Sequence, residues 1–246
     1  RHPHIVGVLD VSEHQGRPYL TTEFIEARSL EAVLRDPVPP ARAIAWVKAI
    51  AEALQYAHEN GIVHRDVKPS NVLIDSQGRP FLTDFGLAKE VEEQAVGGTT
   101  MTLSGTLVGT PQYMSPEQAS GRPERIGPAA DQFSLGVVLY EALTGKLPFH
   151  GNGLRELLNA ISEHDPDPPT RWVPRLHPDL ETICLKAIEK APERRYGTIG
   201  AMAADLGRHL EGEPIEARAP SLAGRLLRKA RKHWAVTLPT AAALLL

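Results

Sequence analysis

The sequence lacks several features that mark particular classes of protein. Among its 246 residues there is one cysteine, Cys184, which excludes an internal disulfide framework and favours a reducing compartment. The formal net charge of −3 leaves no basic excess, so we expect no nucleic-acid partner. The first residues also lack a basic segment followed by a long apolar core, so they do not resemble a secretory signal.

The residues that are present indicate a globular protein with a small β hairpin and a mostly helical body. Hydrophobic residues make up 42% of the chain and charged residues 23%, which is enough to bury a core. Residues 6–25 form two β-rich runs around a polar turn, and residues 71–86 resemble two short strands. The loop over 87–109 is long for a compact domain, so we expect it to be functional. Apolar spacing predicts helices over 29–36, 41–61, 131–145, 153–163, 180–191 and 199–212.

One short stretch, HRDVKPSNVLI at residues 64–74, carries the chemistry of phosphoryl transfer. An aspartate on a loop can orient a hydroxyl and receive its proton, and a nearby lysine can neutralise charge on a transferring phosphoryl group. Asn71 offers an amide oxygen to a metal ion. The alternative is a surface loop in which Arg65 and Lys68 merely pair with Asp66, but the whole pattern is too specific to favour it.

This stretch resembles the catalytic loop of the serine/threonine protein kinases, HRDxKPxN. The sequence DFG follows at residues 84–86, and residues 109–118 resemble the substrate-docking and APE segment, with Ser115 in place of alanine. The resemblance covers residues 1–211. It implies an α+β, protein-kinase-like fold that is mainly the helical C-lobe, with a remnant of the N-lobe sheet and hinge. The catalytic loop is matched at His64, Arg65, Asp66, Lys68, Pro69 and Asn71.

The resemblance also implies two cofactors, ATP and Mg²⁺. A lysine together with a threonine near the catalytic aspartate favours serine and threonine hydroxyls over tyrosine as acceptors. The implied roles are catalysis for Asp66, Lys68 and Thr110, metal binding for Asn71 and Asp84, and adenine binding for Glu23, Ile25 and Leu73.

Other positions have structural or regulatory roles in the family. Asp131 matches the acidic residue that holds the backbone of the HRD motif, and Arg195 is expected to form a buried ion pair with Glu117. Arg65 resembles the residue that meets a phosphate on the activation loop. The other matched positions are His64, Phe85 and Gly86, and the acceptors proposed for that phosphate are Thr102, Ser104 and Thr106.

Parts of the kinase pattern do not occur in the sequence. No G-x-G-x-x-G loop follows a suitable strand, and neither the strand lysine nor its helix glutamate is found. We therefore expect this chain to be an N-terminally truncated kinase that is inactive by itself. Two alternatives stay open: a pseudokinase-like scaffold that binds without catalysis, and a small-molecule phosphotransferase of kinase-like fold.

The C-terminal residues suggest a membrane anchor. Residues 212–234 form a basic juxtamembrane linker, and residues 235–246 are twelve uncharged, mostly apolar residues that fit the start of a single transmembrane helix. A terminal helix that packs on the body is the alternative. The expected location is the cytoplasmic face of the membrane, as in many bacterial kinases of this type. The expected partners are protein substrates and a second kinase copy for trans-autophosphorylation.

Overall fold

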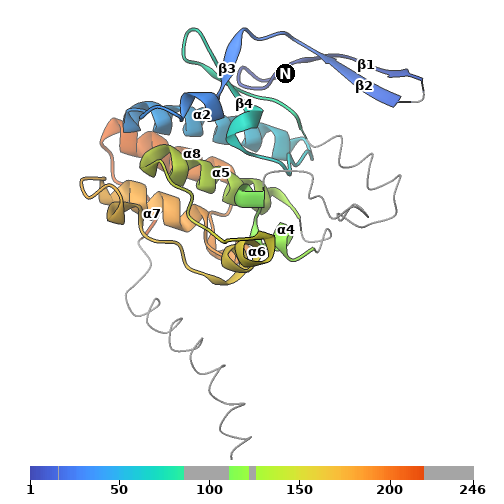
Figure 1. Ribbon diagram of the computed structural model, residues 1–246. Helices are drawn as coiled ribbons and strands as arrows, with labels where there is room; N and C mark the ends of the chain where they lie inside the picture. Colours follow the sequence, from blue (N-terminus) through green and yellow to red (C-terminus); the bar gives the residue numbers. More distant parts are fainter. Residues whose placement is uncertain (16, 86–110, 122–125, 219–246) are drawn as a thin grey trace, which may run out of the picture.

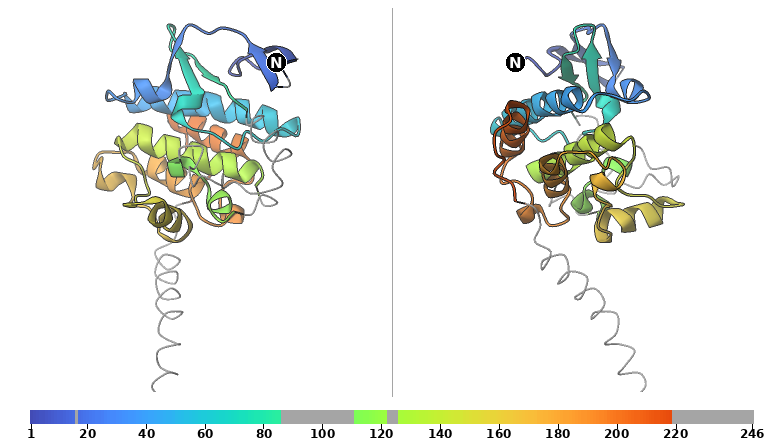
Figure 2. Two further views of the ribbon diagram at one scale, coloured as in Figure 1. Left: turned by 45° about the vertical axis from the view of Figure 1, so that its right-hand side comes forward. Right: turned by 90° about the vertical axis from the view of Figure 1, so that its left-hand side faces the viewer.

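The computed structural model describes residues 1–15, 17–85, 111–121 and 126–218 (Figure 1). The short strands lie at one end of a body made of helices, and further views show the same arrangement (Figure 2). The strands are β1 (Val8–His14), β2 (Arg17–Thr22), β3 (Ala27–Ser29), β4 (Val72–Asp75) and β5 (Pro80–Leu82). The helices of the described residues are α1 (Leu30–Val33), α2 (Pro40–Glu59), α4 (Pro116–Ala119), α5 (Pro128–Thr144), α6 (Leu154–Glu163), α7 (Pro178–Ala187) and α8 (Ile199–Glu211).

The strands form two small antiparallel sheets. β1 pairs with β2, which confirms the predicted hairpin, and the three-stranded sheet has the order β3-β4-β5. The N-terminal segment runs beside β5, where Leu82 donates its N–H to the carbonyl of His4 and accepts the N–H of Val6. These bonds join the start of the chain to the strand that leads into the DFG motif.

The helical body is built around α5. This helix is buried along most of its length, and α2 packs against both α5 and α8. At Gly136 the two helices α5 and α7 approach so closely that an added Cβ would lie 2.7 Å from the side chain of Ile188. The centre of the core therefore depends on a residue without a side chain at this position.

Each helix predicted from the apolar pattern is present, with differences at its ends, and the short helix α4 was not predicted. α2, α5 and α7 each begin at a proline, which suits the first turn because its fixed φ is already helical. The predicted helix over 180–191 ends earlier, at Ala187. The carbonyls of Glu189 and Lys190 accept hydrogen bonds from Arg195 instead of continuing the helix.

The chain stays packed on the body after α8. The buried carboxylate of Asp205 accepts the backbone N–H groups of Glu216 and Ala217, and Ala217 is itself buried. The first residues of the expected linker therefore belong to the packed body. The basic cluster and the apolar end lie outside the described residues. Within residues 1–85, 111–121 and 126–218, apart from residue 16, no helix combines the length and apolarity needed to cross a membrane.

Candidate active site

A buried carboxylate fixes the loop between α2 and β4. Asp131, in the first turn of α5, is 1% exposed and accepts the backbone N–H groups of His64 at 2.8 Å and Arg65 at 2.7 Å. It also contacts Nε2 of His58 at 2.8 Å. Arg65 has a φ of +65°, which is uncommon for a residue other than glycine. Bonds from amides to a charged acceptor are strong, so Asp131 stabilises this unusual turn next to Asp66.

His64 connects the loop to the segment that follows β5. Its buried ring contacts the carbonyl of Thr83 through Nε2 at 2.9 Å, and Nδ1 accepts the N–H of Asp66 at 3.2 Å. Burial lowers the pKa of His64, so the neutral ring is favoured. A neutral ring donates from one nitrogen and accepts at the other, as these two contacts require. The ring of Phe85 lies 4.6 Å from the ring of His64.

Asp66, Lys68 and Asn71 form a compact polar cluster on this loop. Nζ of Lys68 lies 2.8 Å from Oδ2 of Asp66. Nδ2 of Asn71 donates to the same oxygen at 3.1 Å and to the backbone carbonyl of Asp66 at 2.9 Å. The Asp66 side chain keeps 27% of its surface exposed, so solvent can reach it. The carboxylate is thus oriented from two sides and can still meet a substrate group.

Asn71 and Asp84 are brought together by the backbone. Thr83 donates its N–H to the carbonyl of Asn71 at 3.0 Å, and Asp84 follows directly with a φ of +58° and an exposed side chain. Within the part of the chain that the structure describes, both hydrogen bonds of the Asn71 side chain use Nδ2. The amide oxygen of Asn71 is therefore not used by either of these hydrogen bonds. This oxygen and the carboxylate of Asp84 are oxygen ligands of the kind that Mg²⁺ prefers, so the two residues fit the ion.

Two of the predicted adenine-binding residues follow β2, and the third lies in β4. Glu23, just after β2, donates its backbone N–H to the carbonyl of Gly7 at 2.8 Å. An added Cβ at Gly7 would lie 2.7 Å from the carboxyl carbon of Glu23, so the exposed Glu23 side chain lies directly over this glycine. Ile25 is half-buried beyond Glu23, and Leu73 is half-buried in β4.

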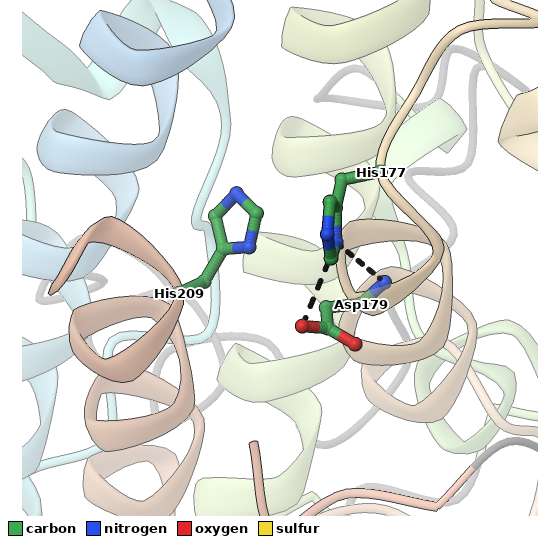
Figure 3. A group of neighbouring side chains, drawn as sticks. All are labelled: His177, Asp179 and His209. Atoms are coloured by element: carbon green, nitrogen blue, oxygen red, sulfur yellow. Dashed lines mark hydrogen bonds and ion pairs between the residues drawn. The ribbon is translucent and has the colours of Figure 1, made fainter. Parts of the chain in front are cut away.

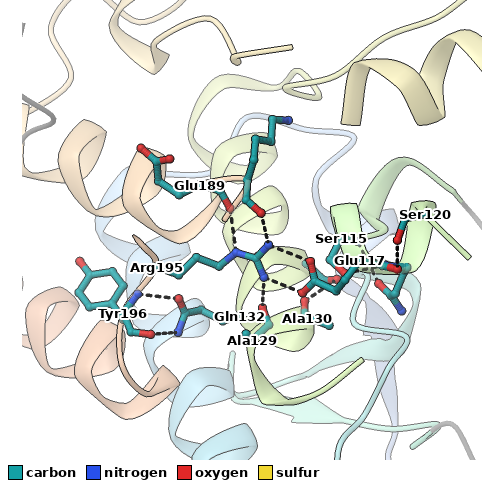
Figure 4. A network of polar contacts seen from close by, with 12 residues as sticks. Ser115, Glu117, Ser120, Ala129, Ala130, Gln132, Glu189, Arg195 and Tyr196 are labelled. Carbon is teal, nitrogen blue, oxygen red and sulfur yellow. Dashed lines mark hydrogen bonds and ion pairs between the residues drawn. The ribbon is translucent and has the colours of Figure 1, made fainter. Parts of the chain in front are cut away.

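A second buried charge holds α4 to the body (Figure 4). Arg195 donates to both carboxylate oxygens of Glu117, at 2.7 and 2.9 Å, and the Arg195 side chain is fully buried. Its other donors reach the carbonyls of Ala129, Glu189 and Lys190. This is the ion pair that the family pattern led us to expect. Because every partner is in place, the pair joins three segments that are distant in the sequence.

Two supporting residues were missed by the sequence analysis. His58 binds Asp131, and Gln118 donates from Nε2 to the carbonyl of Arg65 at 2.7 Å. Gln118 is also part of the capping box of α4 with Ser115. The S-x-x-Q spacing could have revealed the box, but nothing in the sequence indicated the contact with the loop. Predicted residues that lie outside the described residues are Gly86, Thr102, Ser104, Thr106 and Thr110.

Comparison with known proteins agrees with this geometry. The protein kinase domain family matches residues 1–206. The chain is 39% identical over 222 residues to serine/threonine-protein kinase PknB of Mycobacterium tuberculosis, a match that covers 88% of the chain and 35% of the relative. It is 39% identical over 204 residues to serine/threonine-protein kinase Pkn1 of Myxococcus xanthus, which covers 81% of the chain and 29% of the relative. The chain thus spans about a third of the length of these relatives.

Proposed function

Because this chain belongs to the protein kinase family, we propose that the protein it forms part of transfers the γ-phosphate of ATP to serine and threonine hydroxyls of other proteins. The cluster of Asp66, Lys68 and Asn71 is the observation that carries this proposal. It consists of a carboxylate, an ammonium group and an amide on one loop whose backbone is held by Asp131, which supports the roles of base, cation and metal ligand. The names of the relatives, all serine/threonine-protein kinases, support the same acceptor class.

Each residue of the cluster has a separate task in this proposal. Asp66 accepts a hydrogen bond from the attacking hydroxyl, which orients the oxygen. It receives the hydroxyl proton as the oxygen bonds to the γ-phosphorus and the bond from that phosphorus to the ADP oxygen breaks. Lys68, 2.8 Å from the carboxylate, offsets negative charge that develops on the phosphoryl group. Thr110 is proposed to assist Lys68 in contacting the substrate hydroxyl.

ATP and Mg²⁺ are the proposed cofactors. Asn71 and Asp84 would hold the metal ion, which would neutralise negative charge on the phosphates. The backbone of Glu23 and Ile25 would face the adenine edge, and Leu73 would pack under the ring. The half-buried side chain of Leu73 in β4 leaves part of its surface available for that contact.

The complete gene product is the right material for the test. Asp66→Asn should lower phosphate transfer by a factor on the order of 10² or more, as expected for a lost base, and leave ATP binding in place. Asp36→Asn, which changes an exposed carboxylate beyond α1, should behave like the wild type. Peptides that offer serine, threonine or tyrosine identify the acceptor. Full activity of Asp66→Asn would refute the assignment, and wild-type protein that binds ATP without transfer would favour a scaffold.

Regulation by phosphorylation forms a further part of the proposal. Arg65 lies beside Asp66 and is the cation that would meet a phosphate on Thr102, Ser104 or Thr106. A second kinase copy would add that phosphate in trans. Changing all three acceptors to alanine should remove most activity of the complete protein. Mass spectrometry of an active preparation that finds no phosphate over residues 87–110 would contradict this part.

We place the protein at the cytoplasmic face of a membrane, with a single anchoring helix. The sequence supports this through five basic residues followed by an uncharged apolar segment at 235–246. The complete protein should stay in the pellet after carbonate extraction, and protease added outside the cell should spare the kinase domain. A wholly soluble complete protein would favour the alternative of a terminal packing helix. The basic residues are Arg225, Arg228, Lys229, Arg231 and Lys232.

A further inference from the structure

A second group of polar side chains lies at the contact between α7 and α8, outside the catalytic loop. His177 and Asp179 come from the start of α7, and His209 comes from the last turn of α8 (Figure 3). The ring centres of the two histidines are 5.0 Å apart, and Nδ1 of His177 is 3.5 Å from Oδ2 of Asp179. The three residues offer ligand atoms that all lie within 4.8 Å of one another.

We propose that His177, Asp179 and His209 bind a divalent transition-metal ion of the Zn²⁺ class. Two imidazole nitrogens and one carboxylate are a donor set that Zn²⁺ uses, with a water in the fourth position. Imidazole ligands suit Zn²⁺, Ni²⁺ and Cu²⁺ better than Mg²⁺, which prefers oxygen. This site therefore takes an ion different from the one proposed for Asn71 and Asp84.

The geometry needs only small side-chain movements to close around such an ion. Metal–ligand bonds near 2.1 Å place tetrahedral ligand atoms about 3.4 Å apart, against the upper limit of 4.8 Å in the structure. The side chains of His177 and Asp179 are 59% and 32% exposed, so they can rotate without disturbing the core. The backbones that carry them are regular helix starts and ends, which keeps the approach fixed.

The tendency of the His209 imidazole to be neutral also favours metal binding. Burial and the neighbouring His177 lower the pKa of His209, and Asp179 opposes this change. Metals bind the neutral imidazole, so a lowered pKa removes competition from protons near neutral pH.

Such a metal would act as a link between two helix ends. His177 caps the start of α7 and His209 lies near the end of α8, so one bound ion joins segments that are distant in the sequence. An ion that binds only the folded state stabilises it by mass action. The expected sign of metal binding is therefore a rise in melting temperature.

His177 has a second role that the test must separate from metal binding. Its Nδ1 accepts the N–H of Asp179 at 3.3 Å and so caps α7. Asparagine is also a favoured N-cap residue, so His177→Asn removes the imidazole and keeps the cap. His209→Gln removes the second imidazole from a surface position near the helix end.

The test is a Zn²⁺ titration of the 246-residue chain, prepared without a polyhistidine tag. His2→Gln and His4→Gln are included in every protein because these two neighbouring rings could also bind metal. We expect one ion per chain, a higher melting temperature with Zn²⁺, and no such change with Mg²⁺. With Co²⁺ as a probe, absorption in the visible range should show a site of low coordination number.

The variants decide the outcome. His177→Asn and His209→Gln should each weaken Zn²⁺ binding at least tenfold and remove the Co²⁺ signal, and circular dichroism should show both folded. His164→Gln, which changes an exposed histidine at the end of α6, should bind as tightly as the parent. The proposal is overturned if a variant that combines His177→Asn with His209→Gln keeps the parental affinity for Zn²⁺. It is also overturned if His164→Gln weakens Zn²⁺ binding as much as the single variants do, or if Zn²⁺ leaves the melting temperature unchanged.

Discussion

Replacing Arg195 by methionine should strongly destabilise the helical body. The substitution removes both hydrogen bonds to Glu117 and leaves that carboxylate buried without its cation. Breaking a buried ion pair from one side costs about 3–5 kcal/mol, whereas an exposed pair contributes about 1 kcal/mol or less. The Arg195 side chain is fully buried, so the larger figure applies. Three backbone carbonyls also lose their donor.

Urea unfolding followed by circular dichroism measures this loss directly. For a domain of this size each kcal/mol lowers the melting temperature by about 2–4 °C, so Arg195→Met should melt roughly 10 °C lower. Adding Glu117→Gln to Arg195→Met removes the buried charge that Arg195→Met leaves without a partner. The double variant should therefore lose less free energy of unfolding than the sum of the losses in the two single variants. Arg171→Met, which breaks an exposed pair, is the matched control. A loss below about 1 kcal/mol for Arg195→Met, or additive losses, would refute the reasoning.

Three further changes test other contacts. Asp131→Asn leaves one loop amide without its acceptor, so stability should fall by about 1–3 kcal/mol and turnover of the complete protein by about 10- to 100-fold; unchanged turnover would contradict the role of Asp131. Gly136→Ala places a Cβ 2.7 Å from Ile188 and should cost about 1–3 kcal/mol in urea unfolding, whereas a gain would show that the helices can separate. Burial lowers the pKa of Lys190 to about 7, so the unfolded state binds the extra proton and stability should rise with pH between ~7 and ~9; Lys190→Met should flatten this rise, and parallel curves would count against it.

The helices could be predicted from sequence because the apolar period and the punctuating residues agree. α2 begins at Pro40 and ends before Gly61, where φ is +75°, and both residues are visible signals in the sequence. The predicted end of α7, at residue 191, was wrong for a physical reason. The carbonyls of Glu189 and Lys190, just beyond α7, bind the side chain of Arg195, and no local pattern reports such a bond.

The candidate site also contains residues that the sequence predicts and residues that it does not. Asp66, Lys68 and Asn71 lie within six residues, so their proximity follows from the sequence once the loop is identified. His58 and Gln118 support the loop through single hydrogen bonds to partners far along the chain. One hydrogen bond leaves no periodicity or motif behind. Sequence therefore reveals the proposed reacting groups better than the groups that hold them.

Two kinds of variant can be distinguished by their contacts with the catalytic loop: changes in residues that hold the loop, and a change in the residue that contacts the carboxylate of Asp66. Asp131 from α5 and Gln118 from α4 bind the loop backbone, and the carbonyl of Thr83 binds the neighbouring imidazole. These hydrogen bonds hold the loop and do not involve the carboxylate of Asp66. Lys68 orients that carboxylate directly. Changes in the supporting residues should therefore lower stability and turnover together, because the loop moves. Lys68→Met should lower turnover more than it lowers stability. The side chains of its ion pair are 16% and 27% exposed, so breaking the pair should cost less than the ~3–5 kcal/mol of a fully buried pair. A large loss of stability in Lys68→Met would show that this residue holds the loop as well as the reacting group.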